Sequence, residues 1–262
     1  MAFLECKNVR IAGISAGVPK TIISNLELTN ISKDYDAAAF VETTGVKERR
    51  VSDTYTTSDL CYGAAEQLIR DLNWDKAEID AIVFVSQTAD YILPATSCIL
   101  QDRLGLSKEC YATDIALGCS GWVYGLSSAV AMMTSGMIRK ALLLVGDAKK
   151  RADGPRDPLF GHAGTATALE YCEGEEGFKF HFGTDGSGFD AIITPDGGSR
   201  NQVSPSSFEL EEIDGKMMHR LQTRMKGMDV FSFGISTAPK SVKKLGEKFG
   251  FDYLTYDYFV FH

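Results

Sequence analysis

Apolar and polar positions along the chain follow two periods, one typical of β-strands and the other typical of α-helices. Short continuous apolar runs indicate buried strands, whereas apolar residues that recur roughly every three or four positions indicate helices packed on a core. Runs of the two kinds alternate, so the sequence predicts an α/β architecture in which helices cover sheets. The expected strands are residues 9–16, 79–86, 111–117, 141–145 and 256–260.

Four expected helices lie between or after these strands, and residues with end-forming chemistry flank them. Ser58 is expected to cap the first helix, whose apolar stripe is Leu60, Ala64, Leu68 and Leu72. The second covers residues 96–104 and closes at Gly105, because glycine readily adopts the left-handed backbone that ends helices. The third runs from Trp122 to Ser135-Gly136, and the fourth covers residues 228–249.

Glycine-rich pieces mark a change in the chain after Pro155. FGHAGTATALE (160–170) and GTDGSG (183–188) match neither a dinucleotide-binding fingerprint nor a P-loop, so tight turns against a neighbouring element are expected rather than a phosphate cradle. Residues 191–216 contain two prolines, three glycines and several serines, which predict a long surface excursion.

Composition and charge narrow the function classes. The 262 residues are 44% hydrophobic and 24% charged, as in an ordinary globular protein, and no apolar run approaches the roughly 20 residues that span a bilayer. A formal net charge of −8 argues against a nucleic-acid-binding protein. With no leader pattern at the N-terminus and cysteines at irregular spacing, the chain is expected to be cytoplasmic. Two local basic stretches, 149–156 and 216–226, are best explained as solvated surface charge.

One thiol, Cys119, has the position of a nucleophile. It lies between a predicted strand and the first turn of a predicted helix, and Gly118 and Gly121 leave room for a sharp turn. At a helix N-terminus, unpaired backbone N–H groups and the positive end of the dipole favour thiolate over thiol and can bind a developing oxyanion. The alternative, a buried structural cysteine, is better suited to Cys6, Cys61, Cys98, Cys110 and Cys172.

No metal or redox site is predicted. None of the six cysteines forms a CxxC pair, and no cluster of histidine and cysteine has the spacing of zinc ligands.

Seven segments together resemble the ketoacyl-ACP synthase III family of thiolase-fold condensing enzymes. They occur in the family's order and cover nearly the whole chain: TTGVKERR (43–50), ADYILPATSCILQDRLG (89–105), DIALGCSGWVYGL (114–126), FGHAGTATAL (160–169), GTDGSG (183–188), MKGMDVF (225–231) and YDYFVFH (256–262). The resemblance implies a layered α-β-α-β-α fold. Residues 1–170 would form the half that carries the nucleophile, and residues 171–262 part of a C-terminal half.

The same resemblance implies a reaction and two catalytic residues. Cys119 would accept an acyl group from acyl-CoA or acyl-ACP, and His262, at the end of FVFH, would promote decarboxylation of malonyl-ACP. The chemistry suits these residue types, because a thiolate exchanges readily with a thioester and an imidazole can hydrogen-bond a developing enolate. No permanently bound cofactor is implied.

Partners follow from the resemblance as well. It implies a homodimer in which Leu93, within Tyr91–Pro94, lines the acyl pocket of the other subunit, and substrate contacts from Gly227 and Phe231. Acyl carrier proteins are acidic, so docking is expected on Lys216, Arg220 and Arg224.

The chain departs from the family pattern in three places. Ala39 and Thr43 stand where the family stacks adenine between Trp and Arg, so coenzyme A is expected to bind weakly or to be replaced by a carrier protein. His162 stands where the family has an acid, and a structural role is expected for it. The family's catalytic Asn would follow His262, so a C-terminal segment, in cis or in trans, is expected to complete the fold and the site.

Two other functions remain open on the sequence. The first is acyl transfer from Cys119 to an oxygen or nitrogen acceptor without decarboxylation, with histidine acting as a base. The second is a non-catalytic relative that serves as a dimerisation or chain-length-shaping subunit.

Overall fold

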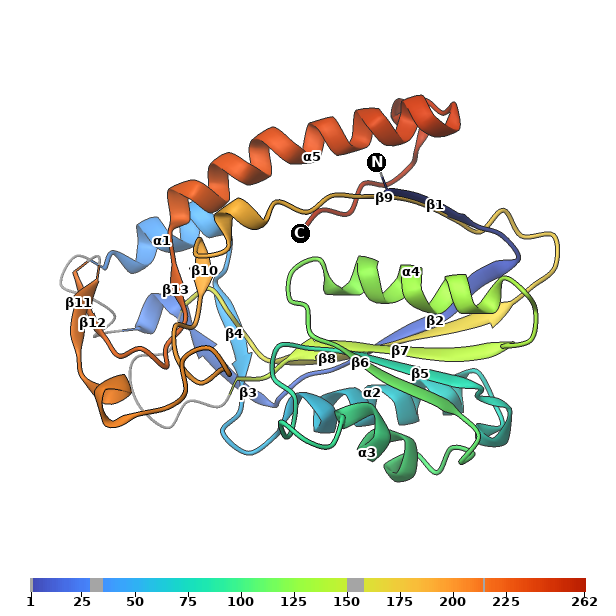
Figure 1. Cartoon of the computed structure of the whole chain (residues 1–262), viewed down its shortest axis with the longest axis horizontal. Coiled ribbons are helices and arrows are strands. Elements are labelled where there is room, and N and C mark those ends of the chain that lie inside the picture. Colours follow the sequence, from blue (N-terminus) through green and yellow to red (C-terminus); the bar gives the residue numbers. More distant parts are fainter. Residues whose placement is uncertain (1, 29–34, 150–157, 214) are drawn as a thin grey trace. The chain divides into compact units, whose positions relative to one another are not determined.

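The computed structural model describes residues 2–28, 35–149, 158–213 and 215–262 (Figure 1). Its residue contacts divide the chain into two compact units. The larger comprises residues 5–178 with His262, and the smaller comprises residues 1–4 and 179–261. The partition into residues 1–170 and 171–262 as two thiolase-like halves stays a prediction.

A five-stranded mixed sheet is the centre of the larger unit. Its strand order is β2-β8-β7-β5-β6, in which β5 runs parallel to both neighbours and β8 runs antiparallel to β7 and β2. Every residue of β5 is buried, as its continuous apolar sequence AIVFV predicts. The strands are β2 (Val9–Gly17), β5 (Ala81–Val85), β6 (Tyr111–Ile115), β7 (Lys140–Asp147) and β8 (Ala163–Tyr171).

Helices cover both faces of this sheet. Figure 1 shows α2 (Thr57–Asp71) and α3 (Thr96–Arg103) on one face and α4 (Gly121–Met133) on the other. Apolar side chains of α2 and α3 pack on β5, β7 and β8, where Phe84, Leu100 and Leu142 are completely or almost completely buried. The predicted alternation of strands and covering helices is therefore confirmed for this unit.

The start of α2 differs from the prediction. The cap is Thr56, whose hydroxyl accepts a hydrogen bond from the backbone of Asp59 while the Asp59 carboxylate accepts one from the Thr56 backbone. This reciprocal pair satisfies two N–H groups at the helix end. Ser58 is instead buried inside the first turn, and its hydroxyl donates to Asp90 Oδ2 at 2.6 Å.

The strand before Cys119 is shorter and more exposed than expected. β6 ends at Ile115, two residues early, and none of its residues is fully buried. It lies at the end of the sheet order with β5 as its neighbour, so one of its edges is not covered by another strand of this sheet. An apolar sequence cannot distinguish a covered central strand from an edge strand.

The glycine-rich segment 160–170 is a strand over most of its length and not a turn. It forms β8, and its glycines allow close approach: a Cβ on Gly164 would lie 2.4 Å from the backbone nitrogen of Cys61. The expectation of close packing against a neighbouring element is correct, but that element is α2 and the segment is extended.

The larger unit also contains a two-stranded antiparallel ribbon and a short α-helix among its described residues. β3 (Thr21–Ser24) pairs with β4 (Glu48–Val51). α1 (Ala37–Thr44) begins after Asp36, whose carboxylate accepts hydrogen bonds from two backbone N–H groups, and ends at Gly45 with φ of 72°.

The smaller unit contains one long helix and short strands. The predicted helix is confirmed as α5 (Gly227–Phe249). The predicted surface excursion 191–216 contains short ordered strands. The strand pairs of this unit are β10 (Ile192–Ile193) with β13 (Arg224–Met225) and β11 (Glu211–Ile213) with β12 (Lys216–Met218). β1 (Ala2–Cys6) pairs with β9 (Phe178–Phe182), and each of these two strands has residues in both units.

The prediction of a strand at residues 256–260 is wrong. These residues are irregular and exposed, with Tyr258 at 87% and Val260 at 94% of full exposure. A β-strand requires a neighbour that accepts and donates its backbone hydrogen bonds, and alternating apolar residues alone cannot supply one.

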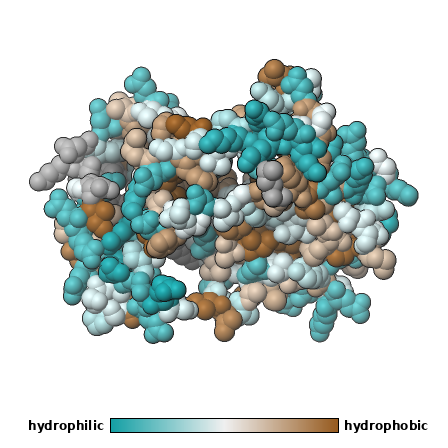
Figure 2. All heavy atoms as spheres, turned by 45° about the horizontal axis from the view of Figure 1, so that its top comes forward, coloured by the Kyte–Doolittle hydropathy of each residue, from teal (hydrophilic) through white to brown (hydrophobic). Residues whose placement is uncertain are grey.

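Figure 2 shows apolar side chains among the polar ones on the surface of the molecule.

Across the described ranges, no helix combines the length and apolar character needed to cross a membrane.

Candidate active site

Cys119 is exposed in the turn between β6 and α4. The turn is closed by a hydrogen bond from the Gly121 backbone N–H to the Gly118 carbonyl at 2.7 Å. Ser120 is the N-cap residue, and its carbonyl accepts from Tyr124 N–H at 3.1 Å. The thiol-bearing residue thus directly precedes the helix cap, as the sequence predicts, and lies beside the positive end of a 13-residue helix.

Glycines bring the start of α4 very close to the sheet. A Cβ on Gly121 would lie 2.7 Å from Val85 Cγ1, and one on Gly125 would lie 2.7 Å from both Val85 and Leu143 side-chain atoms. The indole Nε1 of Trp122 donates to Thr167 Oγ1 at 3.1 Å. These contacts fix the first turn of α4, so Cys119 is carried on a rigid support.

The other thiols differ in ways that matter for reactivity. Burial raises the pKa of Cys61 to about 12 and that of Cys110 to about 11, and it raises the pKa of Cys6 as well. Cys98 is exposed, within the first turn of α3. Cys172 is partly buried. Cys119 and Cys98 are therefore the two exposed thiols, and Cys119 alone occupies a strand-to-helix turn with Gly118 and Gly121 near it.

Polar residues that sequence analysis missed surround the end of β5. The Asp147 carboxylate, at the end of β7, accepts three hydrogen bonds at one oxygen, Oδ1: from Ser86 Oγ at 2.9 Å, Gln87 N–H at 2.9 Å and Thr88 Oγ1 at 3.0 Å. Thr57 Oγ1 lies 2.6 Å from Thr88 Oγ1. The signal in the sequence was the change from apolar residues to Ser-Gln-Thr directly after a buried strand.

The two histidines considered in the sequence have different settings. His162 is half-buried, and its Nδ1 accepts a hydrogen bond from Ser52 N–H at 3.1 Å, in agreement with a structural role. His262 is exposed. Within the described ranges it forms no hydrogen bond with Cys119, so its catalytic role stays a prediction.

Two of the three predicted carrier-docking residues are engaged in ion pairs of the smaller unit. Arg220 Nε lies 3.0 Å from Asp196 Oδ2, and Arg224 Nη2 lies 2.8 Å from Glu211 Oε2. The hydrogen bond from Arg220 lowers the pKa of Asp196. Lys216 is exposed on β12.

The remaining predicted site residues are exposed. Leu93 is 84% and Phe231 59% exposed, and Gly227 is the exposed first residue of α5. Ala39 and Thr43 are exposed four positions apart on α1, so they share one face of that helix, and neither offers a ring or guanidinium for stacking.

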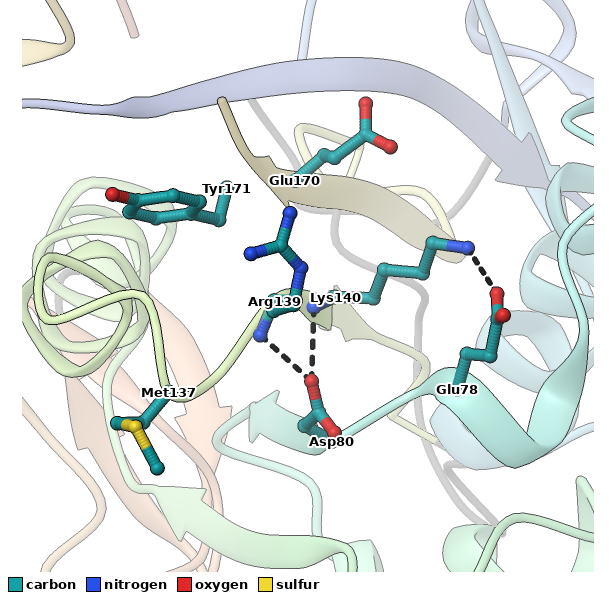
Figure 3. Close-up of a pocket in the computed structure, with 7 residues that line it drawn as sticks. All are labelled: Glu78, Asp80, Met137, Arg139, Lys140, Glu170 and Tyr171. Carbon is teal, nitrogen blue, oxygen red and sulfur yellow. Dashed lines mark hydrogen bonds and ion pairs between the residues drawn. The ribbon is translucent and has the colours of Figure 1, made fainter. Parts of the chain in front are cut away.

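A pocket of about 370 Å³ opens at the end of the sheet opposite to the Cys119 turn (Figure 3). It is lined by residues next to the amino ends of β5 and β7, whereas Cys119 follows the carboxyl end of β6, which runs parallel to β5. Its carboxylates are engaged: Asp80 accepts from the backbone of Arg139 and Lys140, and Glu78 pairs with Lys140. None of the predicted site residues lines this pocket.

No group of three or more potential metal-ligating side chains is found among the residues that the structure describes.

Comparison with protein families gives a match over residues 113–186, which contain Cys119. The matching family is described as 3-Oxoacyl-[acyl-carrier-protein (ACP)] synthase III.

Similar proteins cover almost the whole chain. A beta-ketoacyl-[acyl-carrier-protein] synthase III of Desulfitobacterium hafniense is 31% identical over 91% of this chain and 72% of its own length. A putative 3-oxoacyl-[acyl-carrier-protein] synthase 3 of Campylobacter jejuni is 31% identical over 97% of this chain and 74% of its own.

Solved structures agree with the fold. The crystal structure of a 3-oxoacyl-(acyl-carrier-protein) synthase III superposes with a TM-score of 0.88 at 32% identity, covering 94% of this chain and 75% of that one. The crystal structure of a 3-oxoacyl-(acyl-carrier protein) synthase of Burkholderia xenovorans superposes with a TM-score of 0.85 at 35% identity, covering 98% of this chain and 73% of that one.

Proposed function

This chain belongs to the 3-oxoacyl-[acyl-carrier-protein] synthase III family, and on that premise we propose that Cys119 is the residue that carries the acyl group. As a member of the family, with its thiolase-like fold, the chain is an acyltransferase that condenses an acyl-thioester primer with malonyl-ACP. The observation that carries the assignment of Cys119 is its exposed position directly before the cap of α4.

The first half-reaction is acyl transfer. The Cys119 thiolate attacks the thioester carbonyl, a new C–S bond forms, and the bond to the departing CoA or carrier thiol breaks as that thiol takes up a proton. The partial positive charge at the start of α4 stabilises the negative charge that develops on the carbonyl oxygen. Since α4 is fixed on β5 and β7 through its glycines, this stabilisation needs no rearrangement.

The second half-reaction forms the carbon–carbon bond. Malonyl-ACP loses carbon dioxide, and its C–C bonding electrons form an enolate that attacks the acyl carbon on Cys119 and releases the cysteine thiolate. We assign to His262 a hydrogen bond from its imidazole N–H to the thioester oxygen, which would stabilise the enolate. This assignment rests on the position of FVFH in the family's sequence order.

The primer donor is proposed to be held weakly if it is a CoA thioester. Ala39 and Thr43 supply neither an aromatic ring nor a guanidinium, so adenine lacks its stacking partners on α1. Acyl-CoA and acyl-ACP are therefore both donors to be tested, with acyl-ACP expected to be the better one.

Carrier docking is proposed on Lys216, Arg220 and Arg224. The two arginines share their charge with Asp196 and Glu211, whereas Lys216 projects from β12. Lys216 is thus expected to contribute most to the attraction of an acidic carrier, and the arginines to hold the surface that presents it.

A homodimer is proposed because the larger unit exposes an apolar segment and an uncovered strand edge. Tyr91, Ile92 and Leu93 are 64%, 96% and 84% exposed, and β6 is the last strand of its sheet. A second copy would cover both features and would receive Leu93 in its acyl pocket. Six free cysteines agree with a reducing compartment, so the cytoplasm is the proposed location.

Intact-mass measurement tests the proposal directly. Protein mixed with acyl-CoA or acyl-ACP should gain one acyl mass, and the Cys119→Ser variant should gain none. Removal of the acyl mass by malonyl-ACP with release of a 3-oxoacyl product would distinguish condensation from transfer to an oxygen or nitrogen acceptor. Acylation that persists in Cys119→Ser would refute the assignment.

A further inference from the structure

Gln87 lies beside the nucleophile turn because of the register of two parallel strands. β5 pairs with β6 so that Val85 is opposite Ile115, and the Ser86 N–H continues the pairing to the Ile115 carbonyl at 3.2 Å. The residues that follow each strand therefore emerge at the same edge of the sheet. Gln87 emerges from β5, and the turn of Gly118 and Cys119 emerges from β6.

The Gln87 carboxamide occupies the space that a side chain at position 118 would need. An ideal Cβ on Gly118 would lie 2.4 Å from Gln87 Oε1 and 2.7 Å from Gln87 Cδ. The amide is therefore in van der Waals contact with the backbone of the residue directly before Cys119. Glycine at 118 is what allows this approach.

Hydrogen bonds on the other side hold Gln87 in place. Its backbone N–H donates to Asp147 Oδ1 at 2.9 Å, and the same oxygen accepts from the hydroxyl of Thr88. Thr88 is in turn within 2.6 Å of Thr57 Oγ1, which accepts the backbone N–H of Ala148 at 2.8 Å. The backbone of Gln87 is thus anchored to β7 directly and to α2 through Thr88.

We propose that Gln87 is a positioning residue for the nucleophile: its backbone is anchored by Asp147, and its carboxamide packs on Gly118 and sets where Cys119 lies relative to the start of α4. This inference rests on the proposed acyl transfer at Cys119. It assigns Gln87 no contact with the substrate. Small displacements of a reacting atom reduce rates strongly, so the effect is expected in kcat rather than in KM.

A set of single and double variants tests this role. Gln87→Ala, which empties the space over Gly118, should lower kcat of Cys119 acylation about 10-fold and change the KM for the acyl donor by less than about twofold. Gln87→Met has similar length and should retain about half or more of the wild-type kcat. Gln67→Ala, on the exposed face of α2, is the matched control and should leave both parameters unchanged.

A substitution from the other side of the contact completes the test. Gly118→Ala should displace the flexible end of Gln87 and also lower kcat about 10-fold, whereas the Gln87→Ala/Gly118→Ala pair refills the space and should recover to within about threefold of wild type. Wild-type kcat in folded Gln87→Ala, or an additive loss of about 100-fold in the double variant, would overturn the proposal.

Two further readouts separate the ways in which the test can fail. If thermal melting shows that Gln87→Ala is unfolded, Gly118→Ala decides: an unchanged kcat in that variant would overturn the proposal. The rate of Cys119 labelling by iodoacetamide should rank the variants in the same order as kcat does. Because labelling needs no acyl donor, it tests Gln87 even if wild-type protein is not acylated, a result that would refute the proposed function alone.

Discussion

The indole Nε1 of Trp122 lies 3.1 Å from Thr167 Oγ1 and joins the first turn of α4 to the middle of β8. Thr167 is completely buried, so its hydroxyl cannot exchange this partner for bulk water. The pair thus fixes the helix that directly follows Cys119 to the sheet that supports it. Loss of this hydrogen bond should affect both the stability of the fold and the position of Cys119.

Trp122→Phe should lower the free energy of unfolding by about 2 kcal/mol, because it leaves a buried hydroxyl without its donor and removes part of a packed ring. Chemical denaturation measures this loss. Thr167→Val is the matched partner variant. In the double variant the two losses should be less than additive, and full additivity would show that the hydrogen bond does not couple the residues.

Cys119 should be the first cysteine labelled by iodoacetamide at pH 8. Cys110, with a pKa of about 11, and Cys61, with a pKa of about 12, remain thiols at this pH, since a raised pKa keeps the proton until the pH approaches it. Peptide mapping after a brief reaction measures the order. Faster labelling of Cys98, which is also exposed, would contradict the assignment.

Gly164→Ala should destabilise the larger unit severely, by about 3 kcal/mol or more, because its new Cβ would lie 2.4 Å from the backbone nitrogen of Cys61. Backbone atoms of α2 cannot move away as a flexible side chain can. Gly63 lies on α2 and has open space where a Cβ would be, so Gly63→Ala should instead raise stability by about 0.5 to 1 kcal/mol. Thermal melting of both variants compares the two effects, and equal melting temperatures would contradict the packing of α2 on β8.

Lys216→Glu should raise the KM for malonyl-ACP about fivefold at low salt and reduce its salt dependence, with no change in melting temperature. Arg220→Glu should behave differently, since it places a carboxylate beside Asp196, which is 8% exposed and accepts a hydrogen bond from Arg220. It should lower the melting temperature. If Lys216→Glu leaves the carrier kinetics unaltered, Lys216 is ordinary surface charge.

The lowered pKa of Asp196 fixes the sign of its pH dependence. A carboxyl group whose folded pKa lies below its unfolded value stabilises the folded state above the unfolded value, and the contribution disappears as the pH falls through the folded value. The difference in stability between wild type and Arg220→Gln should therefore be largest near neutral pH and should shrink below about pH 4. Denaturation at several pH values measures this difference, and a constant difference down to pH 2 would contradict the pairing.

Leu93→Phe should shorten the longest primer accepted, because a larger ring would fill the end of the acyl pocket in the other subunit. Competition between acyl donors of increasing length measures this preference. Leu26→Phe, at another exposed leucine, is the control and should leave the profile unchanged. An unchanged profile for Leu93→Phe, or a monomer in sedimentation, would contradict the proposed dimer.

Local sequence predicted the elements that carry the nucleophile. The apolar run of β5 is buried as predicted, because burial of a continuous apolar run follows from the sequence itself. Of the stripe expected in α4, namely Val123, Leu126, Val130 and Met133, the last three are buried and Val123 is 43% exposed. The turn at Cys119 was predictable for the same reason: its glycines and its place between two periods are local features. The family was recognisable from seven motifs in order.

Other features depended on partners that are distant in the sequence. Three features follow from which hydrogen-bonding groups are available in the folded chain. β6 is an edge strand, residues 256–260 form no strand, and Thr56 caps α2 in place of Ser58. The sequence predicted Arg220 and Arg224 to be solvated surface charges. In the structure, Asp196 lies within ion-pair distance of Arg220, and Glu211 within ion-pair distance of Arg224.

The sequence by itself determined the alternation of strands and helices, the exposed thiol before α4 and the family to which the chain belongs. Only the tertiary structure decided that Asp147, Gln87 and Gly118, from three different strand ends, meet beside that thiol. The physical reason is that periodicity records which side of an element is buried, whereas contact between elements depends on strand order and register, which residues distant in the sequence fix together.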